Sequence, residues 1–139
     1  MSIPPILWQP SPERIARSNI TRFIKLVNQR WNAGIGNSDG LYNWSLKEPE
    51  QFWTGLWDFC GVIAESRGER VLIEGDRMPG AKWFADAKLN YAENLLRRRD
   101  GDAALVFRGE DQVRWRLSFA DLYDAVSRTA QALQASGVG

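Results

Sequence analysis

The 139-residue sequence contains no histidine and a single cysteine. The lack of histidine removes the commonest general base near neutral pH and the commonest metal ligand. The lone Cys60 excludes a disulfide within the chain and any CxxC metal site. Both absences favour a reducing, cytoplasmic setting.

Long apolar runs and an excess of one charge sign are also missing. No run approaches the ~20 apolar residues that span a bilayer. Residues 1–12 lack the basic and apolar regions of a signal peptide. The net charge of +1 gives no general attraction for nucleic acid or anionic membrane. We therefore expect neither a nucleic-acid nor a membrane partner.

Tryptophan, in contrast, is abundant. A chain of this size has limited interior for many indoles, because each can bury roughly 150–250 Å². We therefore expect some of them to face a partner surface. The seven tryptophans are Trp8, Trp31, Trp44, Trp53, Trp57, Trp83 and Trp115.

Two amphipathic helices are predicted in the first half of the chain. Ser11 is typical of an N-cap and Pro12 of a first helical position, and the helix continues to Trp31. A loop is predicted over residues 32–40, and a second helix begins near Pro49 after Ser45 and Glu48, which resemble an early capping box. Its apolar side chains follow helical spacing, and Cys60 among them is interpreted as a packed, inert thiol. They are Phe52, Trp53, Leu56, Trp57, Cys60 and Ile63.

The second half of the chain changes character near Asp100. Residues 70–76 predict a short strand, residues 78–88 a loop, and Asn90 with Glu93 the capping box of a third helix that ends in three arginines. Two β-type runs, 103–107 and 112–118, predict a hairpin. Ser118 then caps a final helix, and Gly137 is a natural residue to follow it.

These patterns predict the α/β class, with an α+β arrangement within these residues. Residues 1–100 form a helical region, and residues 101–139 form the hairpin and first helix of a domain whose remainder lies outside the chain. A hairpin and helix of this kind normally continue into a further strand. Without it, we expect the isolated chain to bind other surfaces nonspecifically or to self-associate.

Two segments together carry a family resemblance. "LYNWSLKEPEQFWTGLWDFCGV" followed by "MPGAKWFADAKLNYAENLL" resembles the N-terminal region of the acetyl-CoA-synthetase branch of adenylate-forming enzymes. Within that branch, "LNYAENLLR" resembles the acetoacetate–CoA ligases. "LSFADLYDAVSRTAQALQASGVG" is similar to the first helix of the family's large AMP-binding domain.

The resemblance implies a ligase that uses ATP, Mg²⁺ and coenzyme A. The substrate carboxylate attacks the α-phosphate of ATP, and the thiol of coenzyme A then takes the acyl group from the acyl-adenylate. The family's phosphate loop, its ribose-binding aspartate and its lid lysine have no counterpart here, so we expect no catalytic residue and no activity in this chain alone. Its implied partner is the remainder of the AMP-binding domain. The choice of acetoacetate depends on the resemblance alone.

Few residues remain as candidates for a binding site. Arg97, Arg98 and Arg99 could contact phosphates of coenzyme A, because arginine forks match phosphate geometry. The alternative, which we favour, is that they are cations at a helix C-terminus. A capping box likewise explains Asn90 and Glu93 better than a substrate-binding pair does. The glycine-rich residues 34–40 follow a helix instead of a strand, so they are interpreted as a surface loop.

Two functional hypotheses follow. In the first, the chain is a scaffold that docks on the larger domain, with Trp83 and Phe84 as the anchors of residues 78–99. In the second, it is a freestanding interaction module that binds a partner through its aromatic face. A nucleic-acid binder is disfavoured because basic and acidic residues balance along the chain.

Overall fold

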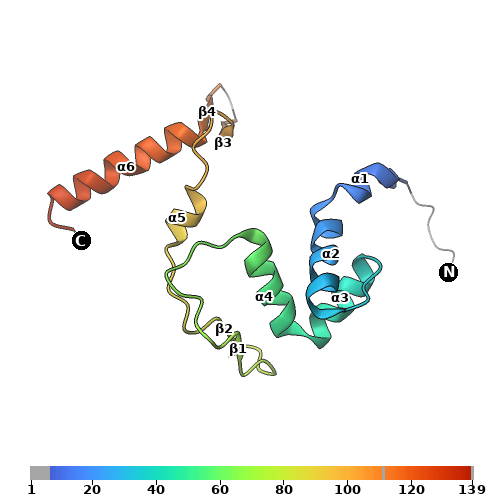
Figure 1. The fold of residues 1–139 in the computed structure, drawn as a ribbon. Helices are drawn as coiled ribbons and strands as arrows, with labels where there is room; N and C mark the ends of the chain where they lie inside the picture. Colours follow the sequence, from blue (N-terminus) through green and yellow to red (C-terminus); the bar gives the residue numbers. More distant parts are fainter. Residues whose placement is uncertain (1–6, 111, 139) are drawn as a thin grey trace. The chain divides into compact units, whose positions relative to one another are not determined.

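The computed structural model describes residues 7–110 and 112–138 (Figure 1). These residues contain six helices and two antiparallel sheets of two strands each, which confirms the expected fold class. The chain divides into two compact units, unit 1 (Met1–Lys88) and unit 2 (Leu89–Gly139). The division falls just before the helix capped by Asn90, whereas the domain boundary after residue 100 stays a prediction.

Unit 1 begins with two helices where the sequence predicted one. Ser11 and Pro12 start α1 (Pro12–Ala16) as expected, but the helix ends there and α2 (Asn19–Trp31) follows. Ser18 causes the interruption. It has an extended backbone, and its hydroxyl accepts a hydrogen bond from the Thr21 N–H, so it caps a new helix.

The predicted loop over residues 32–40 is wrong in its last part. Asn37 accepts a hydrogen bond from the Gly40 N–H at 2.8 Å and caps α3 (Ser38–Lys47). Ser45 lies inside this helix and donates to the Tyr42 carbonyl, so it forms no capping box with Glu48. Pro49 begins α4 (Pro49–Cys60), as predicted.

The core of unit 1 lies between α2 and α4. Gly55 is the buried residue of α4, and a Cβ at this position would lie only 3.0 Å from the Trp31 ring. Glycine therefore lets the two helices approach closely. The aromatic rings of α4 pack on Phe23 of α2, with ring centroids 5.3–5.7 Å apart. The buried hydrophobic residues are Phe23, Val27 and Ile35.

Two short strands follow α4. Gly61, at φ 59°, ends α4: its N–H donates to the Asp58 carbonyl and the next N–H donates to Trp57. Ile63 therefore lies beyond the helix, contrary to the prediction. The expected strand is present as β1 (Leu72–Ile73), and it pairs with β2 (Lys82–Trp83), which lies in the predicted loop.

Unit 2 contains α5 (Tyr91–Leu95), the hairpin of β3 (Ala103–Arg108) and β4 (Arg114–Ser118), and α6 (Phe119–Ala135). The predicted hairpin is confirmed, although Asp111 in its turn lies outside the described residues. Ser118 and Asp121 form a complete capping box on α6. Gly137, at φ 83°, follows this helix as expected.

The helix that follows Asn90, α5, is shorter than predicted. The Asn90 side chain accepts hydrogen bonds from the N–H groups of Ala92 and Glu93, so the predicted cap is present. The helix ends at Leu95, however, and the three arginines lie after it. They are therefore not in the last turn of this helix, where the favoured interpretation had placed them.

Candidate functional site

One face of α4 carries a row of aromatic side chains that the core does not cover. Trp53 and Trp57 are four residues apart, so they lie one above the other on the helix surface. Trp53 is 41% exposed. The helix positions this row because Pro49 fixes its start and Gly61 fixes its end.

The other wall of the site comes from β2 and the residue after it. Trp83 packs against Trp53 with ring centroids 5.4 Å apart, and Phe84 packs against Trp57 at 4.7 Å. Neighbouring residues of a regular strand point to opposite faces. Phe84 has a left-handed backbone, at φ 46°, and this turn brings both adjacent rings onto the same helix. Its N–H donates to the Val71 carbonyl, which holds the turn in place.

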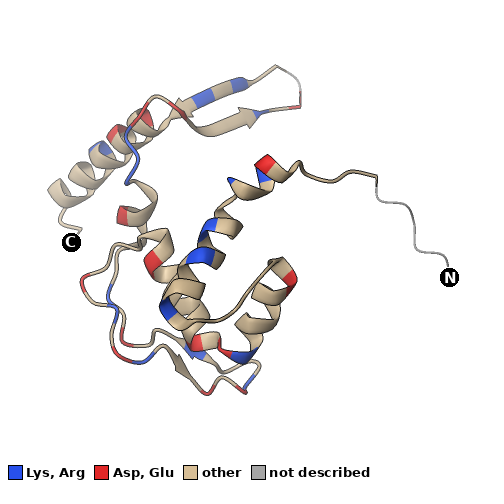
Figure 2. Cartoon of the chain, turned by 45° about the vertical axis from the view of Figure 1, so that its right-hand side comes forward, with Lys and Arg blue, Asp and Glu red and all other residues tan. Residues whose placement is uncertain are grey.

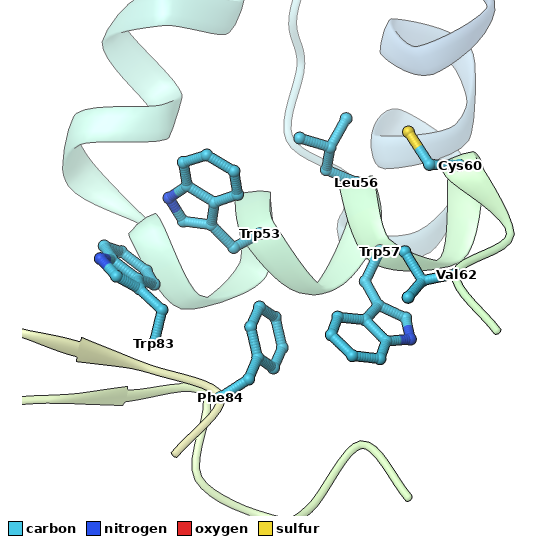
Figure 3. A pocket seen from close by; sticks show the side chains of 7 residues that line it. All are labelled: Trp53, Leu56, Trp57, Cys60, Val62, Trp83 and Phe84. Atoms are coloured by element: carbon cyan, nitrogen blue, oxygen red, sulfur yellow. The ribbon is translucent and has the colours of Figure 1, made fainter. Parts of the chain in front are cut away.

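The two walls enclose an open groove of about 520 Å³, called here the aromatic groove (Figure 3). Figure 3 shows Trp83 and Phe84 projecting from the strand toward α4. Almost all of the lining is apolar, so the groove is suited to bind apolar surface and offers no general acid or base. Its lining residues are Trp53, Leu56, Trp57, Cys60, Val62, Trp83 and Phe84.

Two lining residues differ from the sequence predictions. Cys60 was expected to be a packed thiol, but it is exposed at the edge of the groove because it lies in the last turn of α4. Val62 carried no signal in the sequence. It reaches the groove because the chain turns back at Gly61, and the helical period used for the prediction does not extend past that turn.

A three-residue ion network positions α4 on the rest of unit 1. Asp58 accepts from Arg30 of α2 at 2.5 Å and from Arg67 at 3.2 Å. All three side chains are partly exposed, so the network orients the elements more than it stabilises them. It thereby fixes the helix that carries half of the aromatic groove.

The arginine triplet of unit 2 is largely engaged within that unit. Arg98 donates to both oxygens of Asp100, at 2.8 and 2.9 Å, also contacts Asp102, and lies 4.3 Å from the centre of the Phe119 ring. Arg99 lies over the Tyr123 ring at 3.9 Å. Hydrogen bonds from Arg98 hold the pKa of the Asp100 carboxyl below its usual range. That Arg97, Arg98 and Arg99 contact coenzyme A stays a prediction.

Residues 7–110 and 112–138 contain neither a metal-binding cluster nor a membrane-spanning helix. In residues 7–110 and 112–138, no three Cys, Asp or Glu side chains come together in a way that could hold a metal ion. Among the same residues, no helix combines the length and apolar character needed to cross a membrane.

The aromatic groove lies inside a segment that matches a known protein class. Residues 38–95 match the family described as acetyl-coenzyme A synthetase N-terminus. The match runs from the first residue of α3 to the last residue of α5, so it contains both walls of the groove.

Within this class, the chain is similar to acetoacetyl-CoA synthetases along most of its length. It is 45% identical to the acetoacetyl-coenzyme A synthetase of Rhizobium meliloti and 30% identical to that of Danio rerio, in each case over 96% of the chain. The structure of the acetoacetyl-CoA synthetase from Streptomyces lividans covers 97% of the chain with a TM-score of 0.79 and 38% identity. The resemblance predicted from the sequence is therefore confirmed.

These relatives are much longer than the chain. The matched region makes up 20% of both curated relatives and 21% of the solved chain. The chain thus spans about a fifth of their length, and it corresponds to their N-terminal region.

Proposed function

We propose that this chain is the N-terminal part of an acetoacetate–CoA ligase. That enzyme activates acetoacetate with ATP and Mg²⁺ and transfers the acyl group to coenzyme A, giving acetoacetyl-CoA, AMP and pyrophosphate. The observation that carries the proposal is the 45% identity to an acetoacetyl-coenzyme A synthetase over 96% of the chain. A cytoplasmic location is part of the proposal, because the single cysteine suits a reducing compartment.

The chain's own role is that of a scaffold. Its aromatic groove has no group for proton transfer or phosphate binding, and the exposed indoles of Trp53 and Trp83 leave apolar surface open. Aromatic side chains on a rigid helix and strand suit a permanent interface inside a larger protein. We therefore assign the aromatic groove to contact with the remaining AMP-binding domain, which would supply the catalytic residues.

Exchange of the matched segments tests this proposal. In the Rhizobium meliloti enzyme, the segment that matches this chain is replaced by the chain, and formation of acetoacetyl-CoA is measured. We expect activity from the hybrid and none from the chain alone or from the enzyme without the segment. A hybrid with Trp83→Asp should lose activity, because a carboxylate in the groove cannot be buried without a partner.

The same experiment distinguishes the scaffold hypothesis from that of a freestanding interaction module. A freestanding interaction module predicts a soluble, folded hybrid with no ligase activity, since its aromatic groove would fit an unrelated partner. Formation of acetoacetyl-CoA by the isolated chain would contradict the scaffold role. A hybrid with Leu46→Asp is the matched control, because Leu46 is 64% exposed and lies outside the groove.

A further inference from the structure

Unit 1 has a second groove, which among the described residues shares no lining residue with the aromatic groove. It has a volume of about 770 Å³ and lies along α1, α2 and the residues that lead into α3. We call it the N-terminal groove. Its apolar lining includes Trp8, Pro10, Ile15, Ile20, Ile24 and Ile35.

Three of the apolar side chains in this groove are only partly covered by the described residues, whereas Ile35 belongs to the buried core. Trp8 is 68% exposed, Ile20 54% and Ile15 45%. Exposed isoleucines that lie together in a concave surface, instead of singly, are typical of a binding site. The groove therefore offers contact area that the described residues do not use.

The charged residues that line the groove have one sign. Arg14 and Lys25 are part of the lining, and among the described residues no carboxylate is. The Arg14 guanidinium lies 5.7 Å from the centre of the Trp8 ring, so a cation borders the apolar floor directly. A groove of this composition is complementary to a ligand that is both apolar and acidic.

The wider surface has the same bias. Residues 7–37 contain five basic residues (Arg14, Arg17, Arg22, Lys25 and Arg30) and one acidic residue, Glu13, although the whole chain has a net charge of only +1. Arg30 is neutralised by Asp58. Figure 2 shows basic positions recurring along α1 and α2. The local positive field therefore belongs to the helices that form the groove.

We propose that the N-terminal groove is the docking surface for an acidic amphipathic segment of the remaining polypeptide. Apolar side chains of that segment would pack on the isoleucines, and its carboxylates would face Arg14 and Lys25. The inference rests on the proposed function in one respect, because the occupant comes from the larger enzyme. A segment of the same polypeptide is present at high effective concentration, so a groove with two cations is sufficient to hold it.

Peptide binding tests the chemistry of the groove. The probes are a helical peptide of leucine and glutamate, the same peptide with lysine in place of glutamate, and an acidic peptide with serine in place of leucine. We expect the chain to bind the leucine–glutamate peptide at least ~10-fold more tightly than the other two, and less tightly at high salt. Fluorescence anisotropy of labelled peptides measures the affinities.

Charge reversal locates the binding. The double variant Arg14→Glu and Lys25→Glu should lose about 10-fold in affinity for the leucine–glutamate peptide, because attraction becomes repulsion at both positions. The matched control, Arg114→Glu and Arg116→Glu on β4, should leave the affinity unchanged. Equal binding of the glutamate and lysine peptides, or equal loss in both double variants, would overturn the proposal.

The source of the occupant is tested in the hybrid enzyme. Backbone amides of residues 14–25 should exchange hydrogen more slowly in the hybrid than in the isolated chain. If the hybrid is active and these amides exchange equally fast in both, the docking proposal fails while the ligase proposal stands. If the hybrid is folded but inactive, the ligase proposal fails. The peptide affinities then still test whether the N-terminal groove binds an acidic amphipathic segment. Self-association of the chain that the Arg14→Glu and Lys25→Glu variant abolishes would show a second copy as the occupant and would also overturn the proposal.

Discussion

Phe84 has a backbone conformation that residues with a Cβ seldom adopt, and it does so in the wall of the aromatic groove. The left-handed conformation costs roughly 1–2 kcal/mol for such a residue. Its ring contact with Trp57 and its hydrogen bond to the Val71 carbonyl maintain it. The strain is therefore the cost of placing Trp83 and Phe84 on the same helix.

A pair of substitutions separates the strain from the ring contact. Phe84→Ala and Phe84→Gly both lose the contact with Trp57, so both should unfold at lower denaturant concentration than the wild type. Glycine normally destabilises a strand by ~0.5–1 kcal/mol relative to alanine. At residue 84 this cost is offset by relief of the left-handed strain, so we expect the glycine variant to be no less stable than the alanine variant.

The matched control is the same pair of substitutions at Phe107, which lies within the regular strand β3. There the glycine variant should be the less stable one. The difference in unfolding free energy between the glycine and alanine variants could instead be the same at residues 84 and 107. That result would show that the backbone at Phe84 is not strained.

At the scale of single residues, the sequence predicted which aromatic residues anchor residues 78–99 but not how they do so. Trp83 and Phe84 were recognised because two adjacent large rings in a polar stretch need a packing partner. The positive φ of Phe84 leaves no trace in the sequence, since the usual signal for it is glycine or asparagine. The conformation follows from a tertiary contact instead.

At the scale of elements, Arg98 joins three parts of unit 2. It extends from the end of α5 to the two aspartates before β3, and its guanidinium covers Phe119 at the start of α6. The first N–H groups of α6 donate to the carbonyls of Asp100 and Asp102, so the same short segment also caps this helix. Arg98 therefore stabilises the packing of α6 on the hairpin.

This role predicts a pH-dependent effect of Arg98→Ala. The pKa of Asp100 is lowered by hydrogen bonds from Arg98, so the resulting stabilisation is present above the carboxyl's unfolded pKa, about 3.9. It is lost as the pH falls through the lower pKa of the folded state. Arg98→Ala should therefore be less stable than the wild type at neutral pH, and the difference should shrink in strong acid.

Urea unfolding at neutral and acidic pH measures this difference. Arg98→Lys is the control, because lysine keeps the charge but not the two-pronged donor, and it should fall between the wild type and Arg98→Ala. Part of the acid dependence should persist in both variants, since the Asp102 N–H still donates to Asp100. A stability difference that does not change with pH would contradict the assigned role of the pair.

Helix starts were more predictable than helix lengths. Ser11, Asn90 and Ser118 were recognised as caps because their side chains satisfy N–H groups within three residues, and this requirement is local. Ser18 and Asn37 satisfy the same requirement. Ser18, however, lies within the regular spacing of apolar residues that predicted one continuous helix, and Asn37 lies within the glycine-rich residues 34–40. The broader pattern therefore hid two caps, and α3 was missed with them.

At the scale of the whole molecule, the sequence identified an excess of aromatic surface but not its distribution. None of the seven tryptophans is among the buried residues, and in residues 7–110 and 112–138 the buried hydrophobic core consists of three residues. Counting indoles against chain length was enough to predict this excess. The aromatic groove could not be predicted, because it combines α4 with the later β2. The N-terminal groove was missed because the break between α1 and α2 and the start of α3 were not recognised.

The exposed aromatic groove predicts how the isolated chain behaves in solution. We expect it to bind a hydrophobic dye and to sediment with an apparent mass that rises with concentration, because open apolar surface is covered by dye or by another copy. The double variant Trp53→Gln and Trp83→Gln should weaken both effects. It should also lower stability, because it removes the Trp53–Trp83 contact and the contact of Trp53 with Phe52, each worth ~0.5–1.5 kcal/mol beyond the apolar area that is lost.

Leu46→Gln separates the groove from general surface hydrophobicity. Leu46 is more exposed than either tryptophan but lies outside both grooves, so its replacement should change neither dye binding nor sedimentation. If the wild-type chain is instead a monomer at every concentration and binds no dye, the groove needs no cover. Two half-exposed indoles that need no cover would then give no evidence of an interface. The scaffold role would have to be abandoned, together with the contact between the aromatic groove and the AMP-binding domain.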